Sequence, residues 1–219
     1  MFCEEILTKE VPTLTKNTKG SQALGIMGDS KLKHLPVIQD DKYLYLLSEK
    51  DLFDMNNPEN EIGNISYYAP HINTKTPVFE ILHIMSEDKL SFLPVIDDNG
   101  KYVGGVTLPA LIEKLDEICN AGYHGASIGI EVNGQDYVLS QLVHLVESNN
   151  AHIQSLLSFP IKETGKQILL LKVDLEDASP ILRSLERFDY RVRFCIQEQG
   201  LTDETIKKRL DELMYYIEM

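Results

Sequence analysis

The sequence contains an internal repeat, which limits the folds that the chain can adopt. The segment Leu-Pro-Val-Ile at 35–38 recurs 58 residues further on, at 93–96. A register kept over many positions is typical of two copies of one structural unit, not of chance. The same offset also superimposes Pro12 on Pro70, Leu14 on Ile72, Thr18 on Thr76, Leu24 on Leu82, Met27 on Met85, Leu32 on Leu90 and Asp40 on Asp98.

Each copy predicts the same β-α-β-β-α unit. An extended piece precedes an amphipathic helix, at 21–27 in one copy and 77–85 in the other, and two apolar strands and a closing helix follow. Asp, Asn and Gly between the two strands favour tight turns. A polar stretch at 56–60 contains Pro58 and predicts the linker. We therefore expect the first repeat at 1–60 and the second at 61–120.

The Leu-Pro-Val-Ile strand after an amphipathic helix, followed by a hairpin and by Ser48-Glu49-Lys50-Asp51, resembles a CBS domain. The tandem copies resemble a Bateman module. This resemblance implies paired sheets whose clefts bind adenine nucleotides or related adenosyl compounds. It makes AMP, ADP, ATP and S-adenosylmethionine the candidate ligands, with no obligatory cofactor, and it implies a regulatory binding module.

The first copy carries the polar groups that such a ligand needs. Ser48 and Asp51 place a hydroxyl and a carboxylate on the first turn of a helix, where a ribose and a phosphate could be bound. Lys33 and His34 precede the strand where the family often has phosphate-binding bases. The alternative interpretation is that Asp51 is a helix N-terminal acid and that the basic pair is solvated surface.

Apolar strand residues are the candidates for contact with adenine. The second copy departs from the pattern, because 107–110 lacks the carboxylate and Ser91-Phe92 replaces the basic pair. Only the first copy is therefore predicted to be equipped for a ligand. The candidates for the base are Val11, Pro12 and Thr13 and, in the second copy, Pro70, His71 and Ile72.

The remainder predicts a second domain at 125–198 with the order βαββαβ, a ferredoxin-like arrangement. The arrangement resembles an ACT domain, and a CBS pair with an ACT domain is similar to acetoin-utilisation-type regulatory proteins. Tyr137 replaces the usual Gly of the first turn, and Asp136 is interpreted as a helix cap. An amphipathic helix is expected at 202–219, packed either on its own domain or across a dimer. Family analogy favours a homodimer.

Composition argues against several classes of function. A net charge of −13 disfavours nucleic-acid binding. The chain has no membrane-length apolar run or export signal, and three widely spaced cysteines indicate free thiols in a reducing cytoplasm. No metal-binding spacing, phosphate loop or catalytic motif occurs, so we expect no metal site and no enzyme activity. A dimerisation scaffold with degenerate clefts is the alternative function.

Overall fold

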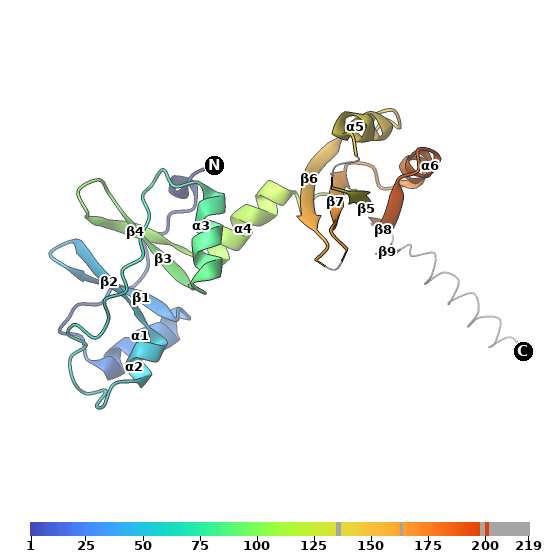
Figure 1. Cartoon of the computed structure of the whole chain (residues 1–219). Coiled ribbons are helices and arrows are strands. Elements are labelled where there is room, and N and C mark those ends of the chain that lie inside the picture. Colours follow the sequence, from blue (N-terminus) through green and yellow to red (C-terminus); the bar gives the residue numbers. More distant parts are fainter. Residues whose placement is uncertain (135–136, 163, 198–199, 202–219) are drawn as a thin grey trace, which may run out of the picture. The chain divides into compact units, whose positions relative to one another are not determined.

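The computed structural model describes residues 1–134, 137–162, 164–197 and 200–201 (Figure 1). The chain divides into two compact units, Met1–Leu115 and Asp116–Met219. Each unit is built around its own set of buried apolar side chains. No helix of the described ranges is long and apolar enough to cross a membrane.

The first unit contains both repeats, and each repeat is a helix, an antiparallel hairpin and a second helix. A short 3-10 turn, Cys3–Glu5, precedes them. Both hairpins carry a register shift at the same place, between Val37 and Ile38 and between Val95 and Ile96. The elements are α1 (Gly20–Ser30), β1 (His34–Gln39), β2 (Lys42–Ser48) and α2 (Glu49–Phe53), then α3 (Val78–Glu87), β3 (Phe92–Ile96), β4 (Tyr102–Thr107) and α4 (Leu108–Cys119).

The leading strand predicted for each repeat is reduced to a single parallel bridge. Leu14 bridges Val37, and Ile72 bridges Val95. The next pair of backbone hydrogen bonds towards the N-terminus would need N–H donors at Pro12 and Pro36, and proline has no N–H. The second repeat has prolines at the equivalent positions, Pro70 and Pro94. The observed repeat is therefore α-β-β-α with a bridged leading segment, which corrects the β-α-β-β-α prediction.

The two repeats are tied together because the segment leading into each one pairs with the second strand of the other. Thr8 and Gly105 exchange two backbone hydrogen bonds of 2.8 and 3.0 Å. In the same way, the N–H of Leu46 donates to the carbonyl of Tyr68 at 2.9 Å. Any cleft along these leading segments therefore has walls from both repeats.

Two adjacent glycines in β4 permit this crossing. Gly104 has a φ of +141°, and a Cβ there would lie 2.7 Å from the carbonyl oxygen of Thr8. A Cβ on Gly105 would lie 2.1 Å from the ring of Phe92. Gly104 therefore allows the close approach of the Thr8 backbone, while Gly105 makes room for an aromatic ring.

The second unit is an antiparallel sheet with the strand order β6-β7-β5-β8-β9. The elements occur in the predicted order βαββαβ, followed by the two-residue strand β9, which was not predicted. The helix predicted at 202–219 lies outside the described residues, as does Asp136. The elements are β5 (Ala126–Asn133), α5 (Leu139–Glu147), β6 (Ile153–Pro160), β7 (Lys166–Val173), α6 (Ser179–Arg187), β8 (Arg191–Gln197) and β9 (Gly200–Leu201).

The core of the second unit lies between one face of the sheet and the two helices. Alternate residues of the central strands, such as Ile128, Ile130 and Leu171, pack with Leu142 of α5 and Leu185 of α6. Because side chains alternate along a strand, the residues between them lie on the opposite face of the sheet. That face carries no helix among the described residues of this unit.

Candidate ligand-binding cleft

A cleft of about 970 Å³ lies in the first unit, between the two repeats. Its size falls within the range of small-molecule sites. Three segments form its walls. The leading segment of the first repeat supplies Thr8, Glu10, Val11 and Pro12; the end of α1 and the turn after it supply Ile26, Asp29, Ser30, Lys31 and Leu32; and the second repeat supplies Ser91, Thr107, Leu108 and Pro109.

The turn after α1 adds a polar wall to this cleft. Lys31 adopts the left-handed conformation, with a φ of 55°, and ends the helix. Its N–H donates to the carbonyl of Gly28, and the N–H of Leu32 donates to that of Met27. This is the arrangement of a left-handed helix cap. Lys89, 58 residues on, has a φ of 54°, so both repeats make this turn.

The N-terminus of α4 is the other polar wall, and its donors are already in use. The hydroxyl of Thr107 accepts a hydrogen bond from the N–H of Ala110 at 3.3 Å. The N–H of Leu108 donates to the carbonyl of Ser91 at 3.1 Å, and Pro109 has no N–H. Lys31 is the one basic side chain among the lining residues, against Glu10 and Asp29. Despite these two polar walls, most of the surface that lines the cleft is apolar, and its charged side chains sum to a slight negative charge.

The residues predicted for the site do not lie together. Val11 and Pro12 line the cleft; Thr13 follows them on the exposed surface. Asp51 lines a separate hollow of about 470 Å³ around the linker. His71 and Ile72 line a third, of about 360 Å³, beside α3. Lys33, His34 and Ser48 line none of these three cavities.

Ser48 and Asp51 form a reciprocal cap on α2. The carboxylate of Asp51 accepts hydrogen bonds from the N–H and the hydroxyl of Ser48, at 2.9 and 2.7 Å. In return, the hydroxyl of Ser48 accepts from the N–H of Asp51 at 3.1 Å. This geometry is a capping box, which the sequence already offered as the alternative interpretation of Asp51.

His34 contacts the second repeat. Its Nδ1 accepts a hydrogen bond from the N–H of Ser91 at 3.2 Å and lies 3.0 Å from the hydroxyl of Ser91. A ring nitrogen that accepts an N–H bond is unprotonated, so His34 is neutral. Burial is the main cause of its lowered pKa. Lys33 has an exposed side chain, and its N–H donates to the same serine hydroxyl.

Pseudo-symmetry identifies the place equivalent to the cleft on the other side of the pair. There, Tyr68 is equivalent to Thr8, because its carbonyl accepts a backbone hydrogen bond from Leu46 just as the carbonyl of Thr8 accepts one from Gly105. Asp88 stands where Ser30 lines the cleft, 58 residues earlier. The hydroxyl of Tyr68 donates to the carboxylate of Asp88. The equivalents of two lining residues are thus joined across this place.

Sequence reasoning missed Asp29, Ser30, Lys31 and Thr107. Thr107 was set aside because its motif has no carboxylate. Its hydroxyl is nevertheless at the position of Ser48, because a one-residue insertion at Asn99-Gly100 increases the offset between the repeats from 58 to 59 residues. The signal that could have found the cleft is the glycine pair of β4. Two glycines in a strand indicate that the backbone of another segment approaches the second repeat closely. The segment that leads into the first repeat, around Thr8, is the one that does so.

A family model for the CBS domain matches residues 3–56 and 62–117, which is half of the chain. The chain therefore belongs to the CBS-domain family and contains a tandem CBS pair. An uncharacterized protein of Methanocaldococcus jannaschii is 34% identical over 107 residues, which are 48% of this chain and 25% of the relative. Inosine-5'-monophosphate dehydrogenase of Thermoplasma acidophilum is 22% identical over 180 residues, which are 75% of this chain and 36% of that enzyme. The chain thus spans about a quarter to a third of these curated relatives.

Solved structures are similar over about half of the chain. A CBS domain pair/ACT domain protein from Thermotoga maritima has a TM-score of 0.49 at 19% identity, covering 53% of this chain and 98% of that one. CBSX2, solved in complex with AMP, has a TM-score of 0.48 at 21% identity, covering 53% and 97%.

Proposed function

We propose that this protein is a ligand-sensing module whose cleft binds an adenosine-containing small molecule. The observation that carries the proposal is the cleft of about 970 Å³ between the repeats. Val11, Pro12 and Leu32 supply apolar surface for a planar base, while the hydroxyls of Ser30 and Thr107 supply polar contacts. A mainly apolar pocket with a few convergent polar groups is the usual form of such a site.

The charges favour a ligand with little negative charge. Glu10 and Asp29 oppose a single lysine, and the first N–H groups of α4 already have acceptors. Each additional phosphate would therefore add repulsion without a new donor. We expect S-adenosylmethionine, methylthioadenosine or AMP to bind more tightly than ATP. The carboxylate of Asp29 is the proposed acceptor for ribose hydroxyls, in place of Asp51.

Regulation follows from the construction of the cleft. Because both repeats form its walls, a bound ligand would favour one arrangement of the two repeats. We propose that this bias reaches the second unit, of ACT type, or a partner, and that the protein works as a homodimer in the cytoplasm. The repeats are proposed to end at residues 60 and 120, and the ACT-type domain to span 125–198.

Matched variants test the site. Thr107→Val and Ser48→Ala each remove a helix-capping hydroxyl, so each should cost about 1 kcal/mol of stability. Only Thr107→Val should weaken ligand binding, about tenfold for one lost hydrogen bond, as measured by calorimetry with AMP, ATP and S-adenosylmethionine. If only Ser48→Ala weakens ligand binding, the ligand binds at the motif of Ser48 and Asp51 in the first repeat and not in the cleft. No binding by any of these compounds at millimolar concentration would refute the proposal.

A dimerisation scaffold is the second candidate. It is favoured by the engagement of Asp51 with Ser48 and by the contact of Tyr68 with Asp88, which occupy polar groups that a ligand would use. Light scattering with and without adenosyl compounds separates the two functions. A scaffold should have the same mass and the same melting temperature in both conditions.

A further inference from the structure

The face of the second unit's sheet opposite α5 and α6 is unusually apolar for an uncovered surface. The residues of this face are identified by the strand register, because residues paired on neighbouring strands lie on the same face of the sheet. Leu157 pairs with Leu170, Leu170 with Gly129, and Gly129 with Phe194; the next row contains Phe159 and Ile168. Four large apolar side chains of this face are exposed, namely Leu157 (39%), Phe159 (45%), Phe194 (38%) and Ile196 (44%). A contiguous apolar surface of this kind indicates an interaction site.

One glycine keeps this face flat. A Cβ on Gly129 would lie 2.3 to 2.8 Å from ring atoms of Phe194, so the ring lies directly across the glycine. The aromatic ring thereby covers the glycine from the neighbouring strand, as aromatic side chains do for strand glycines. The result is a smooth apolar centre that a helix could contact.

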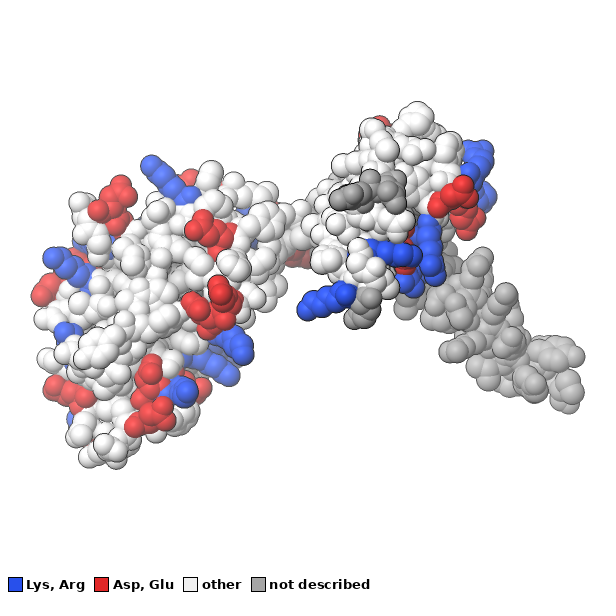
Figure 2. Space-filling model, viewed as in Figure 1, with Lys and Arg blue, Asp and Glu red and all other residues white. Residues whose placement is uncertain are grey.

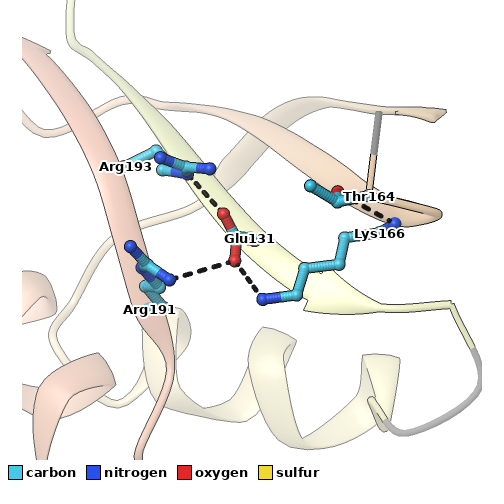
Figure 3. Close-up of polar contacts among 5 residues, drawn as sticks. All are labelled: Glu131, Thr164, Lys166, Arg191 and Arg193. Atoms are coloured by element: carbon cyan, nitrogen blue, oxygen red, sulfur yellow. Dashed lines mark hydrogen bonds and ion pairs between the residues drawn. The ribbon is translucent and has the colours of Figure 1, made fainter. Parts of the chain in front are cut away.

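The same face carries an excess of positive charge. The buried carboxylate of Glu131 pairs with Lys166 at 2.6 Å, with Arg191 at 3.3 Å and with Arg193 (Figure 3). The hydrogen bond from Lys166 is the main cause of the lowered pKa of Glu131, which is therefore ionised. One carboxylate thus faces three cations. Figure 2 shows basic side chains close together on the visible side of this unit, in a protein of net charge −13.

The chain supplies a segment that complements this face in pattern and charge. Residues 202–219 contain five acidic and three basic side chains, and Ile206, Leu210, Leu213 and Ile217 recur at helical spacing. As a helix, 18 residues are about 27 Å long, enough to cross four strands spaced about 4.8 Å apart. The segment starts directly after β9. Leu201 pairs with Ile196, and β9 is antiparallel to β8, so it runs in the direction of Arg193 and Arg191.

We infer that residues 202–219 form a helix that docks on this sheet face of their own chain. The apolar stripe would cover Leu157, Phe159 and Phe194. The acids Asp203 and Glu204, which follow β9 at once, would be near the arginines that share Glu131. The segment then covers an apolar surface on which no described helix of this unit packs.

The absence of tryptophan from the sequence provides a clean test. Phe159→Trp places the only indole of the protein on the proposed interface. Phe188→Trp places it at the end of α6, on the helix side of the same unit, where Phe188 is 47% exposed, against 45% for Phe159. Both variants are measured in the full chain, with and without Leu210→Gln and Leu213→Gln together. Lys208→Gln with Asp211→Gln is the control pair, because it leaves the apolar stripe and the net charge unchanged.

Docking predicts that the Phe159→Trp emission maximum is at shorter wavelength than that of Phe188→Trp. It also predicts that only the leucine substitutions shift the Phe159→Trp emission to longer wavelength and increase its quenching by iodide. The inference would be overturned if the emission maximum of Phe159→Trp were that of a fully exposed indole, or if it did not change with the leucine substitutions. A shift that appears on dilution, with a fall in mass by light scattering, would overturn it too, because the occupant would then be a second copy.

Discussion

Two tyrosines at equivalent positions of the repeats have different hydrogen-bonding environments, and this difference predicts opposite effects of one substitution. The hydroxyl of Tyr43 donates to the carbonyl of Pro70 at 3.1 Å. The hydroxyl of Tyr102, 59 residues further on, is buried and has no partner among the described residues. Burial raises the pKa of Tyr102 to about 12.

The expected magnitudes follow from these contacts. Tyr43→Phe removes a hydrogen bond and should destabilise the first unit by about 1 kcal/mol. Tyr102→Phe removes a buried polar group that has no partner, so it should be neutral or stabilise by up to about 1 kcal/mol. For a unit of 115 residues, 1 kcal/mol corresponds to a change of about 4 °C in melting temperature.

Differential scanning calorimetry of the full chain measures both variants in the transition of the first unit. The repeat provides the control, since both substitutions remove the same atom from equivalent strands. We expect Tyr43→Phe to melt below the unchanged protein, and Tyr102→Phe to melt at or above it. An equal loss of stability in both variants would refute the reasoning, because it would mean that the Tyr102 hydroxyl is satisfied.

Three further predictions follow from side-chain contacts. Burial lowers the pKa of His34, so as the pH falls the unfolded chain takes up a proton at this residue before the folded protein does. The first unit should therefore lose stability as the pH falls below about 6.5, the ordinary pKa of histidine. His34→Gln should remove this dependence of the melting temperature on pH. The pKa of Glu131 is also lowered, but for a carboxylate the stabilisation is present above its ordinary pKa of about 4.3 and is lost as the pH falls through the folded value. Glu131→Gln should therefore flatten the acid-induced fall in melting temperature of the second unit. Tyr68→Ala should release Asp88 and add a second adenosyl site, detected by calorimetry as a doubled stoichiometry.

The fold was largely predictable, because repeated apolar patterns determine helices and strands locally. The offset of 58 residues correctly pairs the bridges at Leu14 and Ile72 and the turns at Lys31 and Lys89. The segment that leads into each repeat was predicted to be a strand but forms only a single bridge. The prediction was wrong because apolar character does not show which N–H groups are needed for hydrogen bonds to the next strand. Pro12 and Pro70 were visible in the sequence, but their effect depends on facing prolines in the next strand.

The cleft was predicted only in part, because it is assembled by contacts between distant segments. Val11 and Pro12 were identified from the leading segment, and they do line it. Their partner wall comes from Thr107 of the other repeat, whereas the sequence suggested Ser48 and Asp51. That pairing is set by the backbone bonds of Thr8 with Gly105. The glycine pair of β4 indicates a close backbone approach at this point, but it does not identify Thr8 as the partner.

The difference between the two repeats can be traced to exchanges of side-chain volume. In the second repeat, Phe92 fills the space above Gly105; at the equivalent positions, the first repeat has His34 and Leu46. Because Leu46 already carries a large side chain, the residue at the position of Phe92 does not need to cover it. His34 is thereby free to accept a hydrogen bond from Ser91 of the second repeat. A polar contact between the repeats therefore depends on an apolar exchange in the neighbouring strand. Such an exchange in one copy is sufficient to make the two sides of a repeated fold chemically different.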